Sequence, residues 1–75
     1  MNWREHITSE PEICHGKACI KGTRVLVSIL LDHLAAGDAT EDVAKSYDIS
    51  IDAVRAALAY AADVAGDRVF DLPAA

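Results

Sequence analysis

The stretch from residue 39 to residue 65 constrains the fold of this chain more than any other part of the sequence. Apolar side chains recur there at steps of three and four, the spacing that places them on one face of a helix. The pattern predicts a helix over residues 40–47 and a longer one over residues 51–65, joined by the turn Asp48-Ile49-Ser50. Ser50 is a favourable N-cap, because its hydroxyl can accept from a free amide of the first turn. Two helices joined this closely have helix-turn-helix order, often used to place the second helix in a DNA groove.

The longer predicted helix has two apolar faces. The first is a continuous stripe at helical spacing, made of Ile51, Val54, Leu58, Ala61 and Ala65. The second is small and nearly as apolar, and consists of Ala53, Ala56, Ala57 and Tyr60. A helix that is apolar almost all round is usually buried, and small side chains let another helix approach closely. We therefore interpret the second face as a packing or homodimer interface before we interpret it as a base-reading surface.

The rest of the chain predicts a hairpin and one more helix. Two short β-prone pieces, residues 18–20 and 23–25, flank a glycine turn and indicate a hairpin, and a further short strand fits around residues 6–8. Residues 27–36 predict a helix, and Gly37 follows where a C-cap needs a left-handed residue. The expected fold is mainly α: a three-helix domain over residues 1–66 in helix-turn-helix order, homeodomain-like or winged-helix-like, with a short N-terminal β-hairpin.

The chain has more apolar material than a small monomer easily hides. It has 75 residues, enough for one domain, and 52% of them are hydrophobic. The excess indicates a homodimer or a docked partner, although small alanine side chains inflate the percentage. Residues 67–75 form a separate tail that is expected either to fold back or to dock on a partner. Its candidate partner-binding residues are Arg68, Val69, Phe70 and Leu72.

The charge of the chain bears on DNA binding. The formal net charge is −5, which argues against strong non-specific binding to phosphates but leaves room for a local basic face. A cluster of cations lies in and beside the predicted hairpin, and two further polar residues lie at the start of the last helix. The candidate DNA-binding residues are therefore Lys17, Lys21, Arg24, Ser50 and Arg55. The alternative interpretation of the hairpin cluster is an ordinary solvated surface.

No sequence motif indicates catalysis, a cofactor or a metal site. Phosphate-binding and dinucleotide-binding glycine motifs, nucleophile elbows and zinc-protease motifs are missing. Cys14 and Cys19 have the wrong spacing for a zinc knuckle, and isolated intracellular cysteines usually behave as small apolar residues. We expect a non-enzymatic cytoplasmic protein without signal peptide, membrane span, metal or cofactor.

Three pieces of the sequence resemble a known family. They are the hairpin ICHGKACIKGTRV, the run SILLDHLAAG and the two-helix unit EDVAKSYDISIDAVRAALAYAADV. Together they are similar to the bacterial family called domain of unknown function number 433. The resemblance implies a hairpin-bearing helix-turn-helix fold. It also implies a proposed role as the antitoxin of a toxin–antitoxin pair, which binds a PIN-like nuclease toxin and its own operator DNA.

Three functions follow from these observations. The leading hypothesis is an antitoxin-like regulator that is a homodimer and binds a PIN-like toxin. The second is a stand-alone DNA-binding transcriptional regulator, favoured by the helix order and the hairpin cations. The third is a homodimeric assembly module without DNA binding, which the alanine-rich last helix would suit.

Overall fold

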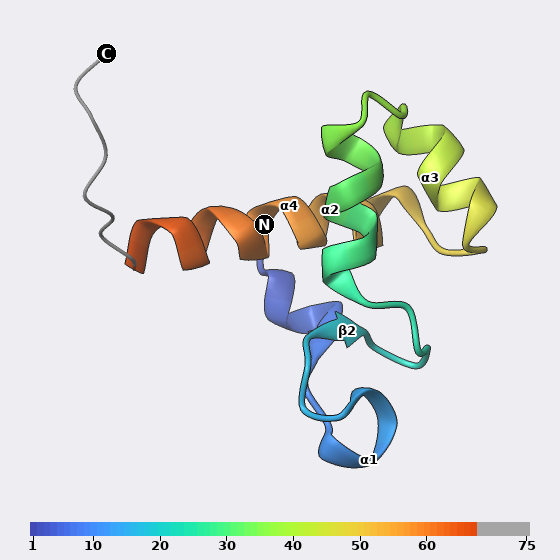
Figure 1. Ribbon diagram of the computed structural model, residues 1–75. Helices are drawn as coiled ribbons and strands as arrows, with labels where there is room; N and C mark the ends of the chain where they lie inside the picture. The colour runs from blue at the N-terminus through green and yellow to red at the C-terminus, as the bar shows by residue number, and fades with distance from the viewer. Residues whose placement is uncertain (68–75) are drawn as a thin grey trace.

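The computed structural model describes residues 1–67 of the chain, and Figure 1 shows how they are arranged. The elements in order are η1 (Trp3–Glu5), β1 (Ile7–Thr8), α1 (Pro11–Cys14), β2 (Cys19–Ile20), α2 (Val27–Ala35), α3 (Thr40–Ser46) and α4 (Ile51–Asp67). Both α2 and α3 pack against α4, and η1 and β1 contact α4 as well. The last part of α4 extends beyond α2 and α3 (Figure 1). Within residues 1–67, no helix combines the length and the hydropathy that crossing a membrane requires.

The predicted N-terminal hairpin is confirmed, but its arms differ from those expected. Strand β1 pairs antiparallel with β2, so that Ile7 lies opposite Ile20, and the ten-residue connection includes the short helix α1. Residues 23–25 form no strand; they add a backbone hydrogen bond from Ile20 N to Val25 O, at 2.9 Å, and Leu26 adds one bridge to Cys19. Strand pairing between distant segments depends on packing as well as on local β propensity.

Turn chemistry explains where the small elements begin and end. Pro11 occupies the first turn of α1, where its missing amide hydrogen is not needed. At the other end, His15 and Gly16 both have left-handed backbone angles, with φ of 53° and 79°, which turn the chain back toward β2. These turns place the one-turn helix α1 within the connection between β1 and β2.

The three main helices follow the predicted ranges closely. Helix α2 ends at Ala35, and Gly37 takes the predicted left-handed conformation with φ of 98°. Between α3 and α4, Asp48 is also left-handed, with φ of 53°. The Ser50 hydroxyl accepts a hydrogen bond from Ala53 N at 3.0 Å and caps α4 as expected. Helix α4 continues through Gly66, which was predicted to end it.

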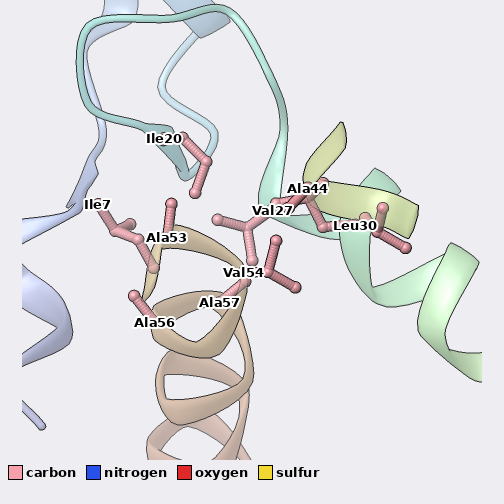
Figure 2. Packing of buried hydrophobic residues seen from close by; sticks show 10 residues of the cluster. Ile7, Ile20, Val27, Leu30, Ala44, Ala53, Val54, Ala56 and Ala57 are labelled. Carbon is pink, nitrogen blue, oxygen red and sulfur yellow. The ribbon is translucent and has the colours of Figure 1, made fainter. Parts of the chain in front are cut away.

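The core forms where α4 crosses the other elements. Its buried members are Ile7, Ile20, Val27, Leu30, Val43, Ala44, Ala53, Val54, Ala56 and Ala57. Figure 2 shows the α4 side chains meeting the two isoleucines of the sheet on one side and Val27 of α2 on the other. Small alanines on α4 allow these elements to approach it closely, while the larger side chains come from the elements around it.

The two predicted apolar faces of α4 differ in how far they are buried. Ala53, Ala56 and Ala57 are buried inside the chain, so in this fold they are not accessible to a second copy. From the predicted continuous stripe, Val54 is buried and Ala61 is partly buried, and the other three members are exposed: Ile51, Leu58 and Ala65. Of the two roles predicted for the alanine face, packing or a homodimer interface, the structure shows packing within the chain.

Candidate functional site

We call residues 20–23, which form a tight turn after β2, the hairpin turn. An open groove lies between this turn and the start of α4. It has a volume of about 330 Å³. Its lining residues are Glu5, His6, Ile20, Lys21, Thr23, Asp48, Ile49, Ser50 and Ala53. The groove thus brings together three segments that are far apart in the sequence: the N-terminal segment, the hairpin turn and the α3–α4 turn.

Local hydrogen bonds fix the conformation of the hairpin turn, which forms one wall of this groove. Gly22 has φ of 80°, which a tight turn with its third residue in a left-handed conformation requires. Thr23 N donates to Ile20 O at 3.0 Å, and the Thr23 hydroxyl donates to the same oxygen at 2.8 Å. Lys21 is at the tip, where its Nζ donates to the Arg4 carbonyl oxygen at 3.3 Å. The lysine is therefore tied to the N-terminal segment.

The α3–α4 turn forms the opposite wall of the groove. Left-handed Asp48 redirects the chain, and Ile49 N donates to Ala44 O at 3.0 Å. Ser50 then caps α4 with its side chain, so its hydroxyl already accepts one hydrogen bond. The groove consequently ends at the first turn of a helix, where the backbone amides have positive partial charge.

Carboxylates dominate the charge around this helix start. Glu5 and Asp48 line the groove together with Lys21, and Asp52 is exposed in the first turn of α4. These carboxylates offset the positive charges that a DNA phosphate would need. The groove is thus a mixed-charge surface.

The structure separates the five candidate DNA-binding residues. Lys21 and Ser50 line the groove described above, whereas Lys17 lines a different one. Arg24 is exposed after the hairpin turn, and Arg55 is exposed on the side of α4 away from the core. Two members of the predicted set therefore line one groove, and the other three do not line it.

A second groove lies between the α1–β2 loop and the helices. Its volume is about 460 Å³, and its lining residues are Gly16, Lys17, Ala18, Val27, Ser28, Leu31 and Tyr60. Tyr60, which was predicted at the dimer interface, is partly buried and stacks edge-on against Trp3 with ring centroids 5.0 Å apart. The indole nitrogen of Trp3 also donates to the Asp63 carboxylate. Trp3 therefore fastens the N-terminus to α4, as expected for a residue that covers a small core.

The side of α4 that faces away from the core is an uncovered apolar stripe. We call it the outer face of α4, and it consists of Ile51, Arg55, Leu58, Ala62 and Ala65. Ile51 is 38% exposed and Leu58 is 44% exposed. Three of its members, Ile51, Leu58 and Ala65, belong to the continuous stripe that the sequence predicted.

The remaining polar clusters are small. Between α2 and α3, His33 Nδ1 lies 2.8 Å from Asp38 Oδ2 and its Nε2 lies 2.7 Å from the Tyr47 hydroxyl, which ties the two helices together. Cys14 and Cys19 are both free and buried. Burial and contact with the Cys14 thiol raise the pKa of Cys19 to about 11, so this thiol remains protonated near neutral pH. Among residues 1–67, no three histidine, cysteine or acidic side chains gather as a metal site would require.

The candidate partner-binding residues of the tail, Arg68, Val69, Phe70 and Leu72, lie outside the described residues. So does nearly all of the predicted tail segment, residues 67–75. Its first residue, Asp67, belongs to α4. The helix thus carries the chain away from α3 toward the far end of the molecule (Figure 1).

These features define a class before they define a family: a small, mainly helical protein with helix-turn-helix order and a short N-terminal hairpin. A family model described as protein of unknown function (DUF433) matches residues 7–61. The chain belongs to this family, as its resemblance in the hairpin and the two-helix unit predicted. No curated protein and no solved structure matches the chain.

Proposed function

We propose that this protein is a non-enzymatic regulator of antitoxin type whose main ligand is another protein, a PIN-like nuclease toxin. The observation that carries the proposal is the contrast at the helix-turn-helix unit. Carboxylates surround the start of α4, whereas large aliphatic side chains are exposed along its outer face. Apolar exposed patches are typical of surfaces that bind proteins.

The toxin is proposed to bind the tail, residues 67–75. The tail contains three large apolar side chains and an arginine, which is the composition of an interface anchor. Helix α4, whose last residue is Asp67, extends beyond α2 and α3 (Figure 1). The family resemblance supports the choice of a PIN-like nuclease as the ligand.

Co-purification tests this proposal. The full chain is expressed with a PIN-like nuclease from a neighbouring gene, and the complex is isolated through a tag on the nuclease. We expect the full chain to co-purify and to inhibit RNA cleavage, and a chain that ends at Gly66 to lose both properties. Co-purification that persists unchanged after the truncation would contradict docking through the tail. If the full chain neither binds nor inhibits the nuclease, the proposed function fails.

DNA binding is the second candidate function, because Lys21 and Ser50 meet in one groove at the start of α4. Helix N-termini and lysine side chains both contact phosphates in DNA complexes. A gel-shift experiment with the promoter DNA of the chain's own operon tests this function. Binding that weakens steeply with salt and is reduced by Lys21→Ala would support it. An unshifted promoter at low salt would exclude it.

A further inference from the structure

We propose that residues 68–75 of the tail bind in the second groove of their own chain, with Leu72 against Tyr60 and Phe70 against Val64. This groove is the one between the α1–β2 loop and the helices. The inference goes beyond the proposed toxin binding, because it concerns the chain without any partner. Three features support it: the lining of the groove, the place where α4 ends, and the spacing of apolar residues in the tail.

The second groove is lined mainly by apolar side chains. Val27 is buried, and Ala18, Leu31 and Tyr60 are partly buried. The volume of about 460 Å³ is in the range of sites that hold small, mostly apolar ligands. Of the residues that line it, Lys17 alone is charged, and its side chain is exposed. The groove at the start of α4 is lined by two carboxylates, so an apolar segment fits the second groove better.

Helix α4 leads from the second groove to the start of the tail along one side. Tyr60, Val64 and Asp67 are spaced by four and three residues, so they lie on the same side of the helix. Tyr60 and Val64 are both partly buried, and Asp67 is the last residue of α4. The chain therefore leaves α4 on the side that carries a residue of the groove, and a reversal of direction returns it along that side.

The tail is long enough for this return. Tyr60 lies about 10 Å from Asp67 along the helix axis, at a rise of about 1.5 Å per residue. The chain from Asp67 to Leu72 spans up to about 17 Å when it is extended. A length of about two residues is thus left for the reversal, and a tight turn over residues 67–70 keeps its ends less than about 7 Å apart.

The spacing of two apolar tail residues matches that of two residues on α4. Phe70 and Leu72 lie on the same side of an extended segment, about 7 Å apart. Tyr60 and Val64 are about 6 Å apart along the helix axis. When the tail runs antiparallel to α4, Leu72 therefore meets Tyr60 while Phe70 meets Val64. Pro73 favours this arrangement, because a residue that precedes proline is biased toward extended conformations.

This arrangement buries no charge. Asp71 lies between the two apolar residues and faces the opposite way in an extended segment, so its carboxylate stays in water. The covalent link also gives the tail an effective concentration on the order of millimolar at the groove. A contact of two apolar side chains, too weak to hold a separate peptide, is then sufficient.

Amide NMR spectra of the ¹⁵N-labelled full chain, without nuclease or DNA, test the docked tail. Leu72→Asp places a carboxylate in the proposed contact. We expect it to move the amide signals of the residues that line the second groove and to leave those of the groove at the start of α4 in place. The matched control is Val69→Asp, because Val69 lies in the proposed turn outside the groove. This control should move neither set of signals.

A second pair of variants changes the groove instead of the tail. Ser28 is exposed in the first turn of α2, where the helix dipole favours negative charge, so Ser28→Glu should retain the fold. The proton–nitrogen NOE of residues 70–72, which reports fast backbone motion, should be close to that of the helices in wild type and should fall in Ser28→Glu. The matched control is Ile29→Glu, because Ile29 is 38% exposed on the same helix and does not line the second groove. It should keep the wild-type value.

Three outcomes would overturn the proposal. The first is that Leu72→Asp leaves the signals of the second groove unmoved. The second is that Ser28→Glu and Ile29→Glu have the same effect on the tail. The third is that the signals of the tail and the groove change with protein concentration, which would assign the tail to the groove of a second copy.

These spectra are independent of nuclease binding. A docked tail in a chain that does not bind the nuclease would reject the proposed function and keep this inference, and nuclease binding by a chain with an undocked tail would do the reverse. Where the proposed function also holds, the groove competes with the nuclease for the same apolar side chains. Ser28→Glu should then bind the nuclease more tightly than wild type, by about tenfold if about nine in ten wild-type tails are docked.

Discussion

The two sides of α4 use apolar residues in opposite ways. The inner side carries Ala53, Ala56 and Ala57 and is buried, whereas the outer side carries Ile51 and Leu58 and is exposed. Isoleucine and leucine are normally buried more often than alanine. The comparison shows that steric fit at a crowded crossing can determine which face enters a core, even against the ranking of side chains by hydropathy.

The reason is the number of elements that meet on the inner side. Helices α2 and α3, the strand β1 and η1 all contact α4. A Leu in place of Ala57 would keep at least one of these elements away from the helix axis. The neighbours supply the missing volume instead, mainly through Ile7, Ile20 and Leu30, as Figure 2 shows for this cluster.

The largest effect is expected from a charge on the inner side. Ala57 is 0% exposed, so Ala57→Asp buries a carboxyl group without a partner and should destabilise the fold by about 3 kcal/mol or more. Because small domains have little stability to spare, we expect no cooperative thermal transition. The matched control, Ala62→Asp on the outer side, should retain one. Circular dichroism measures the thermal transitions of the two variants. The protein is dilute, so that assembly contributes little to either transition.

A smaller effect is expected from added volume. Ala56→Leu inserts three carbon atoms into the filled side of α4 and should cost about 1–3 kcal/mol in urea unfolding. Ala62→Leu adds the same volume on the outer side, where it meets solvent and should change the stability of the monomer by less than about 0.5 kcal/mol. Equal costs for the two variants would mean that the inner side is not more tightly packed than the outer.

Local patterns were sufficient to predict the main helices, because helical spacing, the Ser50 cap and Gly37 all depend on neighbouring residues. Which face of α4 enters the core was not predictable from those patterns, since alanine is compatible with either environment. The pairing of Ile7 with Ile20 likewise depends on how distant segments pack. For the same reason, Lys21 and Ser50 were singled out separately, but their common groove required the hairpin to fold back on α4.

A third test concerns the N-cap of α4, which stabilises the helix that carries both faces. Ser50→Ala removes the hydroxyl that accepts from Ala53 N and should cost about 1 kcal/mol. The converse substitution is Ala39→Ser, because Ala39 precedes α3 without a side-chain cap, and it should stabilise by a similar or smaller amount. Urea unfolding of the two variants and of the double variant checks whether the two effects add. A neutral Ser50→Ala would mean that the cap does not help to hold α4.

The last test measures how well the sheet beside the inner face excludes water. Burial and the Cys14 thiol raise the pKa of Cys19 from 9.0 to about 11 in the folded chain. An unfolded chain therefore loses this proton first as the pH rises, so this contribution to stability is complete below pH 9 and disappears between pH 9 and 11. Cys19→Ala provides the baseline, which contains the contribution of every other ionisable group. Urea unfolding at several alkaline pH values should show a steeper loss of stability for wild type than for Cys19→Ala. Parallel curves would mean that water reaches the thiol in the folded state.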